Sequence, residues 1–145
     1  MCVSNRGSKI KNMFFLFEFT IMQAIVYPAG SHCPPHCPPL YPCRFSINVG
    51  HDSDNIALHF NPRFDENVIV CNSLSGGSWG EEYREGSLSF NRGEECKFYI
   101  NFTMEYFFIK LPDGSTMSFP NRLGDIKYKF FEVHGDARIV GIKIK

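Results

Sequence analysis

The sequence predicts an all-β protein folded as a sandwich of two antiparallel sheets. From Arg44 onward, short segments rich in β-branched and aromatic residues alternate with turn signals at regular intervals. No apolar pattern with a helical period is sustained after Cys43. Regularly spaced short strands without helices are typical of a β-sandwich, and 145 residues are enough for one domain with its own core.

The expected strands follow one another with short connections. They are expected over residues 55–63, 68–72, 87–90, 96–102, 106–111, 117–119, 126–133 and 138–145. A polar turn over residues 65–67 and a glycine-rich loop over residues 73–78 separate the first segments. The sequence Pro112-Asp113-Gly114 predicts a hairpin turn, because proline presets one backbone dihedral and glycine accepts the positive one.

Residues 1–43 do not fit this pattern and are interpreted as an atypical N-terminal segment, partly disordered or irregular, ahead of a β-domain over residues 44–145. The apolar run over residues 13–26 could supply a strand or could have no fixed structure. It is too short for a membrane helix and contains Glu18, so no membrane span is expected. The run faintly resembles a signal peptide, but Glu18 and Pro28 argue against a working one.

The stretch over residues 32–43 mixes histidines and cysteines with several prolines. Proline removes backbone donors, so this stretch cannot form regular sheet. The residues that could ligate zinc are His32, Cys33, His36, Cys37 and Cys43. Their spacing does not match the usual zinc-binding patterns, and a proline-rich linker is the preferred interpretation. The sequence therefore predicts neither a metal site nor a cofactor.

Composition narrows the function further. The 15 basic and 15 acidic residues balance, and no basic run stands out, so neither nucleic acid nor a membrane surface is an expected partner. The cysteines are even in number, yet Cys71 and Cys96 lie within strand-like segments. A free cysteine there behaves as a small apolar residue, so a disulfide framework is not expected.

One polar face is predicted for three segments between His59 and Glu85. Side chains of an extended chain alternate between faces, so Phe60 and Phe64 would point away from it. If the segments pair side by side, the polar face carries His59, Asn61, Arg63, Asn72, Trp79, Glu82 and Arg84. Arginine and asparagine give planar, multidentate hydrogen bonds. A tryptophan ring can stack on the C–H face of a hexose, for about 0.5–1.5 kcal/mol beyond area burial. Together these groups have the chemistry of a sugar site.

Several motifs in this region resemble the carbohydrate-recognition signature of the galectins. They are His59-Phe60-Asn61-Pro62-Arg63, Ile69-Val70-Cys71-Asn72-Ser73 and Trp79-Gly80-Glu81-Glu82-Tyr83-Arg84-Glu85. Two later motifs, Lys110-Leu111-Pro112-Asp113-Gly114 and Phe119-Pro120-Asn121-Arg122-Leu123, are similar to those of prototype galectins with one recognition domain. The resemblance covers roughly residues 45–145 and implies a jelly-roll-like, concanavalin-like sandwich. The two strands that open a galectin are not recognisable in residues 1–42.

The resemblance implies a lectin for β-galactosides, recognising lactose or N-acetyllactosamine-type glycans on glycoproteins or glycolipids. By resemblance, His59, Asn61 and Arg63 would bond the region of the galactose 4-hydroxyl and ring oxygen. Asn72 would reach the 6-hydroxyl, and Trp79 would stack under the ring. Glu82 would orient Arg63 and Arg84 and contact the second sugar. The resemblance also implies a cytosolic protein that leaves the cell by an unconventional route, and it allows a homodimer paired through the terminal strands.

Two other functions compete with sugar binding. A glycoside hydrolase would need two carboxyl groups flanking the scissile bond, one of them protonated. Parity puts only Glu82 on the polar face, and its arginine neighbours favour the charged form, so no enzyme is expected. The remaining alternative is a lectin-like scaffold for protein–protein interaction, with an impaired or unused sugar site, because the opening strands are not recognisable.

Overall fold

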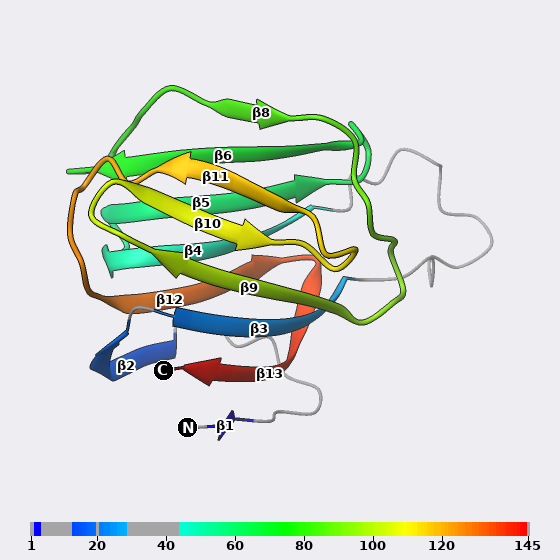
Figure 1. Cartoon of the computed structure of the whole chain (residues 1–145), viewed down its shortest axis with the longest axis horizontal. Coiled ribbons are helices and arrows are strands. Elements are labelled where there is room, and N and C mark those ends of the chain that lie inside the picture. The colour runs from blue at the N-terminus through cyan, green and yellow to red at the C-terminus, as the bar shows by residue number, and fades with distance from the viewer. Residues whose placement is uncertain (1, 4–12, 20, 29–43, 145) are drawn as a thin grey trace.

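The computed structural model describes residues 2–3, 13–19, 21–28 and 44–144. Every regular element in these ranges is a β-strand, and none of them contains a helix. The strands form two antiparallel sheets stacked face to face (Figure 1). The predicted all-β sandwich is therefore confirmed.

One sheet has six strands, in the order β1-β13-β3-β9-β10-β11. These are β1 (Cys2–Val3), β3 (Ile21–Pro28), β9 (Cys96–Phe102), β10 (Tyr106–Lys110), β11 (Thr116–Pro120) and β13 (Ala137–Ile144). The predicted turn after β10 is confirmed. Gly114 has a φ of 89° there, and the Leu111 N–H donates to the Ser115 carbonyl at 2.8 Å.

The second sheet has seven strands, in the order β2-β12-β4-β5-β6-β7, with β8 also paired to β6. These are β2 (Met13–Phe19), β4 (Phe45–Asp52), β5 (Asn55–Arg63), β6 (Val68–Ser75), β7 (Ser78–Trp79), β8 (Tyr83–Glu85) and β12 (Tyr128–Gly135). Gly76 and Gly77 turn the chain between β6 and β7 with positive φ angles of 56° and 79°. Glycine suits this turn because it has no Cβ.

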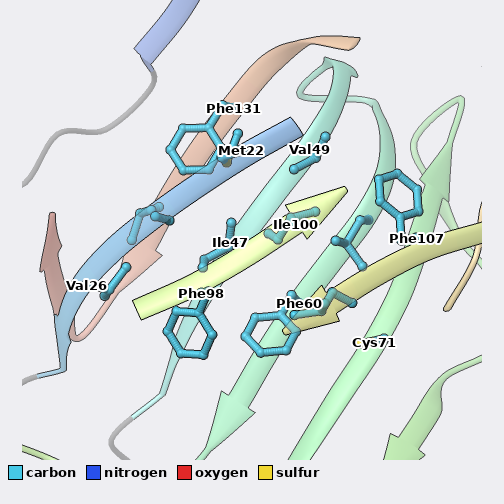
Figure 2. Packing of buried hydrophobic residues seen from close by; sticks show 14 of the residues in the cluster. Met22, Val26, Ile47, Val49, Phe60, Cys71, Phe98, Ile100, Phe107 and Phe131 are labelled. Atoms are coloured by element: carbon cyan, nitrogen blue, oxygen red, sulfur yellow. The ribbon is translucent and has the colours of Figure 1, made fainter. Parts of the chain in front are cut away.

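The core lies between the sheets and is filled mainly by phenylalanine and aliphatic side chains (Figure 2). Along β9, every second side chain is buried, beginning with Cys96. The Phe98 ring centroid lies 5.3 Å from that of Phe60 and 5.2 Å from that of Phe90. Burying a side chain of this size contributes about 1.5–3 kcal/mol. The face of strand β5 that carries Phe60 is therefore packed against the opposite sheet.

Within the apolar run over residues 13–26, residues 13–19 and 21–26 lie in strands, which answers the question that the sequence left open. Strand β3 lies between β13 and β9. Its Met22, Ala24 and Val26 side chains are fully buried. The C-terminal strand β13 thus pairs with β3, a neighbour that was not recognisable from the sequence. The predicted domain division between residues 43 and 44 stays a prediction. No helix in the described ranges is long and apolar enough to cross a membrane.

The expected strand over residues 87–90 is wrong. This segment forms no ladder, and two contacts with distant residues position it instead. The Leu88 N–H donates to the side-chain oxygen of Asn67 at 3.1 Å. Phe90 is buried and packs edge-on against Phe64 with 5.7 Å between centroids. The strand expected from residue 126 begins at Tyr128 instead, because Ile126 lies in the exposed preceding loop.

Substituting Gly50 is expected to destabilise the fold. A Cβ at this position of β4 would lie 2.2 Å from the Asn55 carbonyl oxygen and 2.7 Å from the Ile56 Cα, both backbone atoms of β5. We expect Gly50→Ala to lower the free energy of unfolding by about 1–3 kcal/mol in denaturant titrations. Gly86→Ala is the matched control, because a Cβ there meets nothing within 4 Å. Equal stabilities for the two variants would contradict the close approach of β4 and β5.

Candidate functional site

The structure brings the seven predicted site residues to one face of the seven-stranded sheet. The pairing register places His59 opposite Asn72, Asn61 opposite Val70, and Val70 opposite Arg84. The face contains an open groove of about 440 Å³. It is lined by His59, Arg63, Val70, Asn72, Trp79, Gly80 and Glu82. Asn61 and Arg84 do not line this groove but contact residues that do. The parity argument thus correctly predicted that these residues share one face, and their contact with a ligand stays a prediction.

Trp79 presents an exposed ring at one side of the groove. Its side chain is 54% exposed, which is unusual for the largest aromatic residue. The backbone of Trp79 pairs with Leu74 in β6. Its ring meets the His59 ring edge-on, with centroids 4.9 Å apart and an interplanar angle of 62°. Two neighbouring strands therefore hold an aromatic surface that is open to a ligand.

A row of polar side chains crosses the sheet and fixes the protonation of His59. Asn48 Nδ2 donates to Glu132 Oε2 at 3.0 Å, which leaves Asn48 Oδ1 as an acceptor. His59 Nδ1 lies 2.6 Å from that oxygen and therefore carries the proton. Burial, and secondly the Arg63 charge, lower the pKa of His59 to about 4. The neutral ring consequently offers Nε2 as a hydrogen-bond acceptor.

Asn61 holds the Arg63 side chain in place by a hydrogen bond. Asn61 is buried, and its Nδ2 donates to the Phe45 carbonyl at 2.7 Å. Its Oδ1 accepts a hydrogen bond from Arg63 Nε at 2.9 Å. Both polar atoms of the amide thus have protein partners, and the amide fixes the plane of the guanidinium. A direct contact between Asn61 and a ligand stays a prediction.

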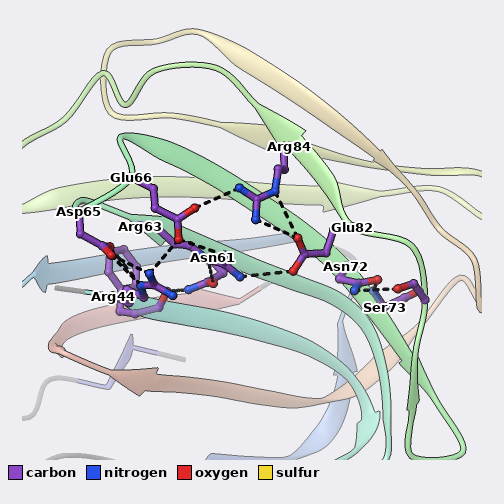
Figure 3. Close-up of polar contacts among 11 residues, drawn as sticks. Arg44, Asn61, Arg63, Asp65, Glu66, Asn72, Ser73, Glu82 and Arg84 are labelled. Atoms are coloured by element: carbon purple, nitrogen blue, oxygen red, sulfur yellow. Dashed lines mark hydrogen bonds and ion pairs between the residues drawn. The ribbon is translucent and has the colours of Figure 1, made fainter. Parts of the chain in front are cut away.

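Carboxylates join the arginines of the site into one ion-pair network (Figure 3). Glu82 lies 3.4 Å from Arg63 and 3.2 Å from Arg84, as the sequence predicted for its orienting role. Glu66 lies 3.3 Å from Arg63, 3.0 Å from Arg84 and 2.8 Å from Arg44. Hydrogen bonding by Arg84, above all, lowers the pKa of Glu66. The network fixes the guanidinium group of Arg63, which lines the groove, and that of Arg84, which contacts the lining residue Glu82.

Asn72 connects the groove to a distant turn. Its Nδ2 donates to the Gly80 carbonyl at 3.0 Å. Its Oδ1 accepts from Arg122 Nη1 at 3.2 Å, and Arg122 also donates to the Glu81 carbonyl at 2.9 Å. The Arg122 guanidinium lies over Phe119, 4.9 Å from the ring centroid. Arg122 thereby fastens the segment that follows Trp79 to strand β6.

Sequence reasoning missed three supporting residues. Asn48 was missed because it lies on strand β4, outside the three-segment stretch. Glu66 was missed because it lies in a turn, where the alternation of side chains along a strand does not predict which way a side chain points. Arg122 is 50 residues away from Asn72 along the chain. The sequence did contain a signal for Arg122, because this residue belongs to the galectin-like motif Phe119-Pro120-Asn121-Arg122-Leu123.

In the described ranges, no three or more potential metal-ligating residues lie close enough together to hold a metal ion. The candidate zinc ligands over residues 32–43 lie outside those ranges. Cys71 and Cys96 are buried free thiols. Burial raises the pKa of both, that of Cys96 to about 11, so they act as apolar packing residues.

The His59 ring is expected to titrate with a midpoint of about 4, because burial and Arg63 disfavour its cation. The ordinary pKa is 6.5, so between these two values the unfolded chain binds more protons than the folded one. The free energy of unfolding should therefore fall as pH drops from about 6.5 to about 4, and His59→Gln should remove that part of the dependence. NMR titration of the imidazole signals measures the midpoint, and a value near 6.5 would contradict the prediction.

Comparisons with known proteins agree with this geometry. The family model described as galactoside-binding lectin matches residues 25–144. The beta-galactoside-binding lectin of Electrophorus electricus is 48% identical over 106 residues, covering 70% of this chain and 78% of that protein. The family match thus covers most of the chain and includes part of strand β3.

Solved structures show the same fold. The crystal structure of chicken Galectin 2 has a TM-score of 0.82 and 33% identity, covering 95% of this chain and 100% of that chain. CG-16, a homodimeric agglutinin from chicken liver, has a TM-score of 0.80 and 31% identity, covering 93% of this chain and 100% of that chain. This chain belongs to the galactoside-binding lectin family, the galectins.

Proposed function

We propose that the protein is a β-galactoside-binding lectin that recognises lactose or N-acetyllactosamine-type glycans on glycoproteins or glycolipids. One observation carries the proposal. The exposed Trp79 ring, the neutral His59 acceptor and the fixed Arg63 donors meet in a single open groove. A galactoside needs this combination, because its hydroxyls both donate and accept while one side of its ring is apolar.

The proposed contacts are those that the resemblance to the galectins implies, and the polar atoms along the groove are compatible with them. The galactose 4-hydroxyl donates to His59 Nε2 and accepts from the Arg63 guanidinium, and the ring stacks on Trp79. The 6-hydroxyl meets the Asn72 amide, while Glu82 and Arg84 contact the second sugar. Support comes from the anchoring of each group before a ligand arrives, because rigid side chains lose little conformational entropy on binding.

The site is proposed to bind without catalysis. A glycosidase needs one carboxyl group that keeps its proton. Hydrogen bonding by Arg84, above all, lowers the pKa of Glu66, so this carboxyl group does not keep its proton, and Glu82 is occupied by ion pairs with Arg63 and Arg84. No feature of the described ranges favours the alternative of a protein-binding scaffold with an unused sugar site.

A homodimer with two outward grooves is the proposed assembly. Strands from the N-terminal region lie at the edges of both sheets, β1 beside β13 and β2 beside β12. The similarity to an agglutinin described as homodimeric supports a dimer. Two weak sites on one particle would cross-link glycoproteins by avidity.

The protein is proposed to occur in the cytosol and, by an unconventional route, outside the cell. Buried free thiols at Cys71 and Cys96 support a reducing origin. N-terminal sequencing of protein recovered from culture medium tests the route. An intact Met1 or its immediate neighbour agrees with the proposal, and cleavage behind the apolar run contradicts it.

Loss of either principal contact is expected to abolish binding. Trp79→Ala removes the stacking surface, and Arg63→Ala removes the central donors, so neither variant should be retained on a lactose resin. Tyr106→Ala is the control, because it removes a 45% exposed aromatic ring from the other sheet. Circular dichroism should give all three the fold of the parent. Undiminished retention of both groove variants would overturn the lectin assignment.

Cross-linking is expected if the protein dimerises. Light scattering should give about twice the 16.6 kDa chain mass. Red cells should then agglutinate, and lactose should reverse the effect. A monomer that still binds the resin would refute the dimer and leave the lectin assignment intact.

A further inference from the structure

The outer surface of the six-stranded sheet is basic and aromatic. The pairing register aligns Lys143, Gln23, Tyr99, Lys110 and Thr116 across β13, β3, β9, β10 and β11. Asn101 and Phe108 form the adjacent row. An open hollow of about 360 Å³ lies here, lined by Tyr99, Ile100, Asn101, Phe108, Lys110 and Thr116. We call it the outer hollow.

Charge distinguishes the outer hollow from the galactoside groove. At the groove, Arg63 and its neighbour Arg84 are paired with Glu66 and Glu82. On the outer surface, Lys110 forms no ion pair with a described carboxylate, and the same holds for Lys97 and Lys143. The exposed alternate positions of β9, β10 and β11 include no acidic residue. This surface therefore has positive charge that its own side chains do not neutralise.

The hollow also offers the other groups that a sugar ring requires. Tyr99 is 40% exposed and Phe108 is 38% exposed, so both rings can contact an apolar C–H face. The Lys110 ammonium lies over Tyr99, 5.8 Å from the ring centroid. An anionic substituent of a sugar can thus contact the Lys110 ammonium while the sugar ring contacts Tyr99 and Phe108. Asn101 and Thr116 supply neutral donors and acceptors for hydroxyls.

We propose that the outer hollow is a second glycan site, which takes an acidic saccharide carrying a carboxylate or a sulfate. The occupant is a single acidic sugar unit of a longer chain, since the hollow has the volume of a small ligand. Nucleic acid fits less well, because its binding needs a series of phosphate contacts and Lys110 is the only cation among the lining residues. The site lies on the sheet opposite the galactoside groove, so one chain could engage both glycans.

Calorimetry of the full chain at low salt tests this proposal. The probes are a heparin-derived oligosaccharide, a sialic acid oligomer, a neutral malto-oligosaccharide and, as a nucleic acid, oligothymidylate. We expect at least one acidic probe to bind. Both probes carry carboxylates and only the heparin-derived one carries sulfate, so stronger binding of the heparin-derived probe indicates sulfate as the preferred anion, and stronger binding of the sialic acid oligomer indicates carboxylate. The double variant Tyr99→Ser with Lys110→Ser should lose about tenfold or more in affinity for the acidic probe that binds more strongly and keep its retention on lactose.

Two variants serve as controls. Lys129→Ser removes an exposed lysine from β12 in the other sheet and should leave the acidic probe bound. Trp79→Ala should likewise leave it bound while lactose retention disappears, which separates the outer hollow from the proposed galactoside groove. The proposal is overturned if neither acidic probe binds, if the double variant binds as the parent does, or if Lys129→Ser loses as much affinity. Equal binding of the neutral probe, or tighter binding of oligothymidylate, would also overturn it.

Discussion

The cross-strand register of β4, β5 and β6 is the constraint on which both the core and the candidate site depend. It places Phe60 between Ile47 and Cys71, and all three are buried. It also sets His59 between Asn48 and Asn72 on the groove side. Because the side-chain period in a strand is two, a slip of one residue would bury the polar row and expose Phe60. The packing energy of the sandwich therefore also selects the geometry of the groove.

Within that register, the polar groups of the site stabilise one another before any ligand is present. No buried side-chain nitrogen or oxygen in the described ranges lacks a hydrogen-bond partner. Asn61 fixes Arg63, Asn48 fixes His59, and Arg122 fixes Asn72. Such contacts reduce the ordering that binding would otherwise require. The exposed ion pairs contribute little to global stability, and orienting the arginines is their main effect.

The two outer surfaces of the sandwich differ in their charge balance. The groove neutralises its arginines with Glu66 and Glu82, which suits an uncharged ligand. The opposite sheet leaves Lys97, Lys110 and Lys143 without such partners among the described residues. The overall formal charge of zero conceals this difference, because net charge reports a sum and not its distribution. A chain that looks neutral by composition can thus present one balanced and one basic surface.

The sequence by itself determined the fold class, most of the strands and the face that carries the seven site residues. It could do so because alternation of side chains is local and depends only on the extended backbone. It was wrong at residues 87–90, where burial of Phe90 against Phe64 overrides the local pattern. It also left residues 13–26 undecided, because strand β3 is recognisable only from its neighbours β13 and β9.

The tertiary structure alone decided which partners surround the site. Asn48, Glu66 and Arg122 reach it from a neighbouring strand, a turn and a distant loop, and only folding sets their distances. The lowered pKa of His59 and the proton on its Nδ1 have the same origin. Burial and a fixed hydrogen-bond row produce them, and neither exists in the extended chain. Residue types thus specified which chemical groups were present, while packing determined their protonation and direction.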